Sequence, residues 1–380
     1  MTARHRSRAI AAIIAATALS VSVAGPVWAA LGVVATIVLP GSAGPSGLAV
    51  SPDGTKVYVA HTGTDTVEVI DAATGTLAAT PIALPGSASP GSVAFSPDGT
   101  KAYVANSFSH TVSVIDVATD TVTSTIVLPV GSGPYAVRFS PDGAKAYVAN
   151  ADNDTISVID GATDLLDPTV IALPAGSYPV AVSFSPDGTK AYVANYFTDT
   201  ISVITVATDT LSATVIALAP GSAPHSVEFS PDGAQAYIAN AGGGTGTVEV
   251  IDTATDSIVG SPIVSLPSGE NPWSIAFSPD GSKAYVAVRD ASVLVIDVAS
   301  ATVLSTVALP TGAGAWSVAV SPDGATVYVT NNSNNSVSVI KDVPALASTG
   351  LNPLPLLGVA GMVILAGLAM AAIRRRPSHT

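Results

Sequence analysis

Short apolar runs alternate with polar turns along this chain, and the alternation follows the two-residue period of β-strands. From residue 92, an apolar run of four residues precedes the turn Ser-Pro-Asp-Gly at 96–99. Residues 101–106, 111–116 and 121–128 then read as three further strands rich in Val, Thr and Ile, with turns between them. Residues 31–341 carry no helical periodicity. This pattern predicts four antiparallel strands in about 44 residues.

The turn Ser-Pro-Asp-Gly recurs at nearly constant spacing. Its proline presets the backbone angle of a turn, and its glycine adopts a positive φ at low cost. The seven copies begin at Ser51, Ser96, Ser140, Ser185, Ser230, Ser278 and Ser321, so the spacing lies between 43 and 48 residues. Seven repeats of four strands predict an all-β, seven-bladed β-propeller.

The two ends of the repeat region complement each other. After the last Ser-Pro-Asp-Gly only two strands follow, at 326–331 and 336–341, so the seventh blade lacks a fourth strand. Residues 34–40 match residues 123–129, which form the fourth strand of the second repeat. We therefore expect residues 34–39 to complete the seventh blade, which closes the ring and removes two open sheet edges.

Recurring strand sequences carry a family resemblance. Ala-Tyr-Val-Ala-Asn at 102–106 recurs at 146–150 and 191–195, with close variants at 236–240 and 327–331. Together with Ser-Pro-Asp-Gly and Val-Ile-Asp-x-Ala-Thr, it resembles the YVTN β-propeller repeat family over residues 31–341. The resemblance implies an exported or surface protein, and some relatives resemble lactonases. Because Tyr and Asn recur in most repeats, we interpret them as packing and loop residues.

The N-terminus has the pattern of an export signal. Arg4, Arg6 and Arg8 precede an apolar run at 9–24, and the small residues Ala29 and Ala30 follow. A basic head, an apolar middle and a small-residue cleavage site together indicate a signal peptide over residues 1–30.

The C-terminus resembles a sortase sorting signal of Gram-positive bacteria. The linker at 342–350 ends in Leu346, Ala347, Ser348, Thr349 and Gly350, an LPxTG-like motif with Ala in place of Pro. An apolar stretch at 351–373 is long enough for a transmembrane segment, and 374–380 form a basic cytoplasmic tail. By this resemblance, sortase would cut after Thr349 and join it to cell wall peptidoglycan. The alternative is a retained single-pass membrane anchor.

The net charge of the repeat region indicates which classes of partner the protein can bind. Residues 30–350 contain eight basic and 27 acidic side chains, a net charge of −19. Such a surface disfavours nucleic acid. The chain has no cysteine, and its histidines and carboxylates show no metal-ligand spacing, so we expect neither a metal site nor a cofactor.

Candidate binding residues lie where the repeats differ from one another, because shared positions serve the scaffold. The position that enters each first strand is the most variable. In repeats one to seven it is Ser46, Gly91, Tyr135, Val180, His225, Trp273 and Trp316. The large rings at this position should crowd one mouth of the central channel, and the loops after the second strands add Phe108, His110, Tyr196 and Phe197. Aromatic side chains on an exposed rim are typical of glycan, peptide or protein recognition. The alternative is that they only plug the channel.

Two charged residues stand out inside the ring. The middle of the first strand is small in five repeats, but it is Arg138 in the third and Glu228 in the fifth. We expect both to face the channel and to pair across it, either directly or through water.

Three functions remain open. We favour a non-enzymatic, cell-wall-anchored binding or adhesion protein that recognises an extracellular glycan, peptide or protein. The second is a lactonase-like hydrolase that uses Arg138 and Glu228, and the third is a purely structural envelope protein.

Overall fold

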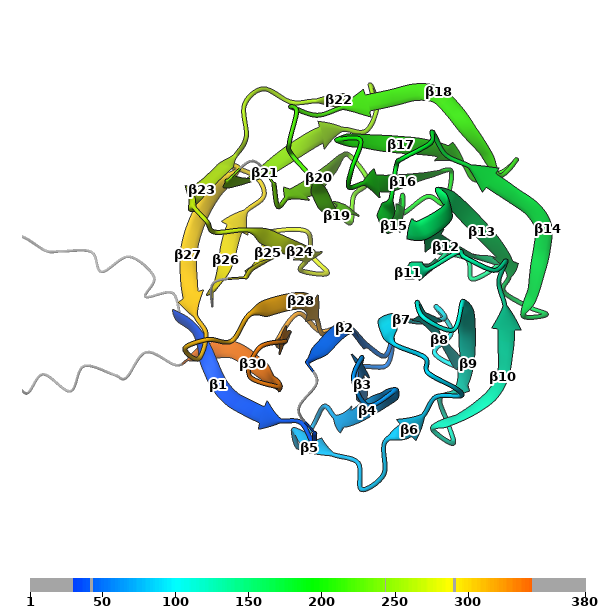
Figure 1. Cartoon of the computed structure of the whole chain (residues 1–380). Coiled ribbons are helices and arrows are strands. Elements are labelled where there is room, and N and C mark those ends of the chain that lie inside the picture. The colour runs from blue at the N-terminus through cyan, green and yellow to red at the C-terminus, as the bar shows by residue number, and fades with distance from the viewer. Residues whose placement is uncertain (1–29, 42–43, 243, 290–291, 344–380) are drawn as a thin grey trace, which may run out of the picture. The chain divides into compact units, whose positions relative to one another are not determined.

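The computed structural model describes residues 30–41, 44–242, 244–289 and 292–343 (Figure 1). The predicted signal peptide, except for Ala30, the sorting motif and the apolar C-terminal segment lie outside these residues. Within the described part of the chain, no helix is long and apolar enough to cross a membrane. The helix found there is a single turn, η1 (Ala151–Asn153).

Seven antiparallel sheets form the blades of a propeller, which confirms the predicted fold. The first strand of each blade lies nearest the centre of the ring (Figure 1). These inner strands, for blades one to seven, are β2 (Pro45–Val50), β7 (Pro90–Phe95), β11 (Pro134–Phe139), β15 (Pro179–Phe184), β19 (Pro224–Phe229), β24 (Pro272–Phe277) and β28 (Ala315–Val320).

The second and third strands of each blade follow outward in hairpin order. The second strands are β3 (Lys56–His61), β8 (Lys101–Asn106), β12 (Lys145–Asn150), β16 (Lys190–Asn195), β20 (Gln235–Asn240), β25 (Lys283–Val288) and β29 (Val327–Asn331). The third strands are β4 (Thr66–Asp71), β9 (Thr111–Asp116), β13 (Thr155–Asp160), β17 (Thr200–Thr205), β21 (Thr245–Asp252), β26 (Ser292–Asp297) and β30 (Ser336–Val343).

The outer strands vary most between blades. Blades two, three, four and six have continuous ones: β10 (Thr121–Val127), β14 (Leu165–Ala172), β18 (Thr210–Ala217) and β27 (Thr302–Ala308). Blades one and five have interrupted ones: β5 (Thr76–Leu77) with β6 (Ile82–Ala83), and β22 (Ser257–Ile258) with β23 (Val264–Ser268).

The ring closes through the N-terminal strand, as the sequence predicts. Strand β1 (Ala30–Val38) lies beside β30 in the sheet of blade seven. Beyond the strand, the Leu39 amide donates to the Asn335 carbonyl at 2.9 Å. The Asn335 side-chain nitrogen donates in return to the carbonyls of Leu39 at 2.9 Å and Gly41 at 2.7 Å. His61 of blade one adds a ring nitrogen 2.8 Å from the Asn335 side-chain oxygen.

Apolar side chains between neighbouring blades make the core. The recurring tyrosine of each second strand is buried. In blades one to five it packs against the phenylalanine that ends the next blade's first strand, whereas Val320 and Val50 stand at that position for blades six and seven. Ring centroids are 4.6 Å apart for Tyr58 and Phe95, and 4.5 Å apart for Tyr192 and Phe229. The recurring asparagines are buried as well, and Asn106 donates to Thr111 and Ser113 within its own blade. Both residue types therefore serve the scaffold.

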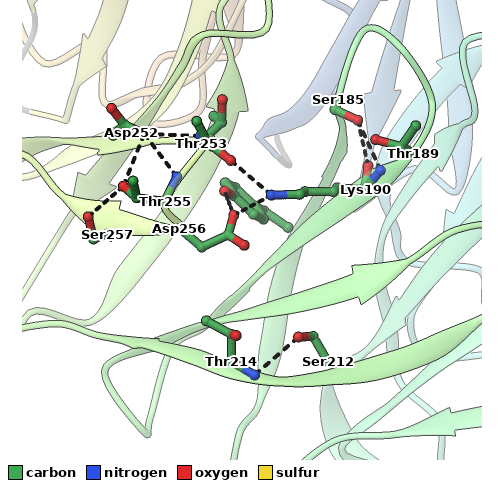
Figure 2. Close-up of polar contacts among 12 residues, drawn as sticks. Ser185, Thr189, Lys190, Ser212, Thr214, Asp252, Thr253, Thr255, Asp256 and Ser257 are labelled. Atoms are coloured by element: carbon green, nitrogen blue, oxygen red, sulfur yellow. Dashed lines mark hydrogen bonds and ion pairs between the residues drawn. The ribbon is translucent and has the colours of Figure 1, made fainter.

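A polar contact, which we call the inter-blade link, repeats beside this packing. Lys190 of blade four reaches the turn after the third strand of blade five, where its Nζ lies 2.8 Å from Asp256 and 2.8 Å from the Thr253 carbonyl (Figure 2). The Tyr192 hydroxyl donates to the same carboxylate at 2.5 Å. The same link joins Lys56 and Tyr58 to Asp120, Lys101 and Tyr103 to Asp164, and Lys145 and Tyr147 to Asp209.

Two blade interfaces lack both charged partners of this link. Between blades five and six, Gln235 replaces the lysine and Ala301 replaces the aspartate. Between blades seven and one, Thr326 and Gly75 stand at these positions. The Tyr237 hydroxyl is buried and has no hydrogen-bond partner among the described residues. Lysine and aspartate are lost together at these two interfaces, whereas the interface between blades six and seven keeps Lys283 and has Ala345 at the aspartate position.

Candidate functional site

Four of the predicted rings meet where the chain enters the inner strands of blades three, five, six and seven. Because each residue occupies the same position in its repeat, the circular arrangement of the blades brings the four side chains into a shared space. His225 and Trp273 have ring centroids 3.9 Å apart, and Trp273 and Trp316 are 4.1 Å apart. The Tyr135 hydroxyl lies 3.3 Å from the His225 Nε2. We call Tyr135, His225, Trp273 and Trp316 the mouth cluster.

The mouth cluster is neutral at its centre. His225 is only 9% exposed, and this burial lowers its pKa to about 4, with a smaller contribution from the Arg289 charge. Its Nδ1 lies 3.2 Å from the Trp273 carbonyl. The Arg289 guanidinium carbon lies 4.8 Å from the Trp273 ring centroid, in a cation–π contact. At neutral pH His225 is therefore an uncharged, oriented ring rather than a cation.

More aromatic rings continue from the mouth cluster across blade four. Tyr196 lies 6.1 Å from His225, and Tyr178 lies 6.4 Å from Tyr196 between ring centroids. Phe197 packs on Tyr178 at 4.6 Å and is 64% exposed. The sequence pattern does not predict Tyr178, because this residue stands two positions before the variable one, Val180. Phe108 is 74% exposed and has no ring contact with any described residue, so the structure does not bring it to this group.

A pocket of about 390 Å³, which we call the seam pocket, opens beside the mouth cluster. Tyr135 and Trp316 line it together with small residues of blades one, two and seven. It exists because blades one and two carry Ser46 and Gly91 where the other blades carry larger side chains. In the sequence, the pocket is therefore indicated by two small residues, Ser46 and Gly91, at the position where other repeats have large side chains.

The polar groups of the seam pocket are arranged to accept hydrogen bonds. The hydroxyls of Ser46 and Thr62 donate to the Pro90 carbonyl, at 2.8 and 3.0 Å. The Asn332 side-chain nitrogen donates to the Pro45 carbonyl at 3.0 Å, which leaves its oxygen as an acceptor. No Asp, Glu, Lys, Arg or His lines the described part of the pocket. These groups suit a neutral ligand that brings its own donors.

The two charged residues lie inside the channel, where they line the space next to the mouth cluster as well as a cavity at the other end. A cavity of about 580 Å³ lies on the side of the Ser-Pro-Asp-Gly turns and includes Arg138 and Glu228. A guanidinium nitrogen of Arg138 lies 3.3 Å from a Glu228 oxygen, so the structure pairs them as expected. Burial raises the pKa of Glu228, and the Arg138 charge opposes that change. The two candidate sites are therefore this carboxyl group and the mouth cluster with the adjoining seam pocket.

The two other histidines within the described residues, His61 and His110, have scaffold partners. The His110 Nδ1 accepts from the Gly133 amide at 3.1 Å, and His61 belongs to the ring closure. Across the described residues, no group of three or more His, Asp or Glu side chains is placed to hold a metal ion.

Known proteins share this architecture. The family described as lactonase, 7-bladed β-propeller matches residues 174–345, and the YNCE-like β-propeller family matches residues 73–192. Among solved structures, a chain of hydrazine synthase from Kuenenia stuttgartiensis is similar, with 25% identity and a TM-score of 0.71 over 79% of this chain and 96% of that one. No curated protein matches the chain. The seven described sheets and both family matches identify this chain as a seven-bladed β-propeller.

Proposed function

We propose that this propeller is a cell-surface binding protein that holds a neutral extracellular glycan in the seam pocket. The observation that carries the proposal is the lining of that pocket: two aromatic rings and several acceptor groups, without a charged side chain in its described part. Sugar rings present C–H faces that pack on aromatic side chains, and their hydroxyls supply hydrogen-bond donors.

A glycan fits the pocket better than a charged peptide does. The chain is acidic as a whole, so a basic peptide would be drawn to its surface, yet the pocket offers no described carboxylate to receive it. A neutral polyhydroxylated ligand needs no such partner. The proposal therefore commits to a neutral glycan rather than to a peptide or protein.

Titration of the tryptophan fluorescence tests this function. Trp28 lies in the predicted signal peptide, so Trp273 and Trp316 would be the only tryptophans of the processed protein. Neutral oligosaccharides should change their emission in a saturable way. Trp316→Ala and Tyr135→Ala should weaken binding, measured by calorimetry, without unfolding the protein. If no neutral oligosaccharide binds, a purely structural envelope role gains support.

The surface location belongs to the same proposal. The signal-peptide pattern at 1–30 and the motif Leu346 to Gly350 support export followed by sortase attachment to peptidoglycan. Mass spectrometry of the cell-wall fraction tests it, because a sorted protein would end at Thr349 with a covalent wall fragment. A protein that keeps residues 350–380 would instead be a single-pass membrane protein.

A lactonase-like hydrolase is the second candidate, and a separate observation favours it. The lactonase family match covers residues 174–345, and Glu228 within it has a raised pKa and faces Arg138. A carboxyl group of this kind is suited to general acid–base work. Lactone hydrolysis that survives purification and disappears in Glu228→Gln would support this candidate.

A further inference from the structure

The rings beside the seam pocket form one continuous series. Starting from Trp316, which lines the pocket, the series passes through Trp273, His225, Tyr196 and Tyr178 and ends at Phe197. Each ring contacts the next, with centroid separations from 3.9 to 6.4 Å. We call this series the aromatic track.

Four blades supply the aromatic track, so no single loop accounts for it. Trp316 comes from blade seven, Trp273 from blade six and His225 from blade five, while blade four contributes the last three rings. Exposure increases at the far end: His225 is 9% exposed, whereas Phe197 is 64% exposed. Large exposed aromatic side chains held against one another are uncommon on a surface without a binding role.

The described structure gives the inner rings of the track a scaffold role but gives none to its far end. The tyrosines of the second strands already fill the spaces between blades, so Phe197 is not needed for the core. Phe108 of blade two is the residue equivalent to Phe197, since each stands two residues after the recurring asparagine of its blade. It projects into solvent alone, whereas Phe197 packs on Tyr178.

We propose that the ligand is a glycan chain rather than a single sugar, with one end in the seam pocket and its following units laid along the aromatic track as far as Phe197. This inference rests on the proposed function, since it concerns the same ligand. It names the class as a neutral linear oligosaccharide or polysaccharide. Stacking on the exposed rings of the track tolerates a repeating unit, because each exposed ring offers an apolar face, while the buried His225 ring joins the two parts of the track.

Chain length is the variable that tests this proposal. The probes are cello-, malto- and chito-oligosaccharides of two and of six units, measured by calorimetry on the wild-type protein. We expect the six-unit member of one series to bind at least about tenfold more tightly than its two-unit member, because the longer chain reaches further rings. Equal affinities for both lengths would overturn the aromatic track.

Two matched variants locate the effect. Phe197→Ala should lose about three- to tenfold in affinity for the six-unit ligand and leave the two-unit ligand unchanged. Phe108→Ala is the control and should not alter the ratio of the two affinities. Trp316→Ala should weaken both ligands. If Trp316→Ala weakens both but Phe197→Ala weakens neither, the seam pocket stands and the track is wrong; if no oligosaccharide of either length binds, both proposals fail.

Discussion

The ammonium group of Lys190 in blade four lies 2.8 Å from the carboxylate of Asp256 in blade five (Figure 2). That carboxylate also accepts a hydrogen bond from Tyr192, so one turn receives two donors from the neighbouring blade. Because the link is repeated at four interfaces and lost as a pair at two others, it offers a set of internally matched experiments.

Removing the carboxylate of Asp256 should lower the stability of the propeller. Asp256→Ala leaves the Tyr192 hydroxyl without its acceptor beside a buried ring, and an unsatisfied buried group costs about 1–3 kcal/mol. The Lys190 side chain is 32% exposed, so the ion pair itself should add little. Chemical denaturation measures the change in free energy of unfolding. Tyr192→Phe removes the hydroxyl together with its need for a partner, so it should lower the free energy of unfolding by less. If the Asp256→Ala protein is as stable as wild type, the link does not contribute to stability.

Installing the missing link should stabilise the protein. Ala301 has a φ of 52°, in the left-handed region that aspartate tolerates better than alanine does. The double variant Gln235→Lys/Ala301→Asp would give the buried Tyr237 hydroxyl an acceptor, and we expect a gain of about 1 kcal/mol in unfolding free energy. A double-mutant cycle measures it. Gln235→Lys alone should give no gain, and strictly additive single effects would contradict cooperation between the two residues.

The closure of the ring should depend on Asn335. Asn335→Asp keeps a side chain suited to the φ of 55° but removes the amide that donates to Leu39 and Gly41. We expect a loss of about 2 kcal/mol in unfolding free energy, because those carbonyls would face a carboxylate instead of a donor. The control is Asn334→Asp, since the Asn334 side chain has its one hydrogen bond among the described residues with Ser336 of its own blade.

Deleting residues 31–39 is the stronger test of closure. This deletion removes the outer strand of blade seven and exposes the edge of β30, so a large fall in melting temperature is expected. Unchanged melting of the truncated protein would mean that the sheet order at the seam is wrong.

Stability should fall in acid partly through His225. Its pKa is lowered to about 4 in the folded protein, whereas an unfolded histidine titrates near 6.5. Between these values the unfolded state binds the extra proton, so this contribution is present above pH 6.5 and is lost as the pH falls toward 4. His225→Gln should therefore reduce the loss of unfolding free energy between pH 7 and 4.5 by on the order of 2 kcal/mol. Parallel pH profiles for the two proteins would contradict this assignment.

The repeat pattern was sufficient to predict the fold. Each copy of Ser-Pro-Asp-Gly fixes one hairpin between the first and second strands, and the match of residues 34–40 to residues 123–129 located the closing strand. The position entering the first strands identified Tyr135, His225, Trp273 and Trp316, because scaffold positions in a repeat protein resemble one another and these four do not.

Contacts between blades were harder to predict. The inter-blade link joins residues more than sixty positions apart. Lys and Asp are lost together at two interfaces, but Lys283 is kept without an aspartate at a third, so the sequence signals the link only in part. The seam pocket depends on small side chains such as Ser46 and Gly91, which carry no chemical signature alone. Phe108 and Phe197 look equivalent by position, and only their surroundings distinguish them.

The pairing at the seam also orders the events of folding. Leu39 and Asn335 are 296 positions apart. Strand β1 can therefore pair with β30 only after the seven repeats between them have been synthesised. Contacts of such high sequence separation form slowly, while each blade can assemble from its own local hairpins. We therefore expect the blades to fold one after another and the pairing of β1 with β30 to form last. Until that pairing forms, both strands have an unpaired edge that can bind a strand of another chain and cause aggregation.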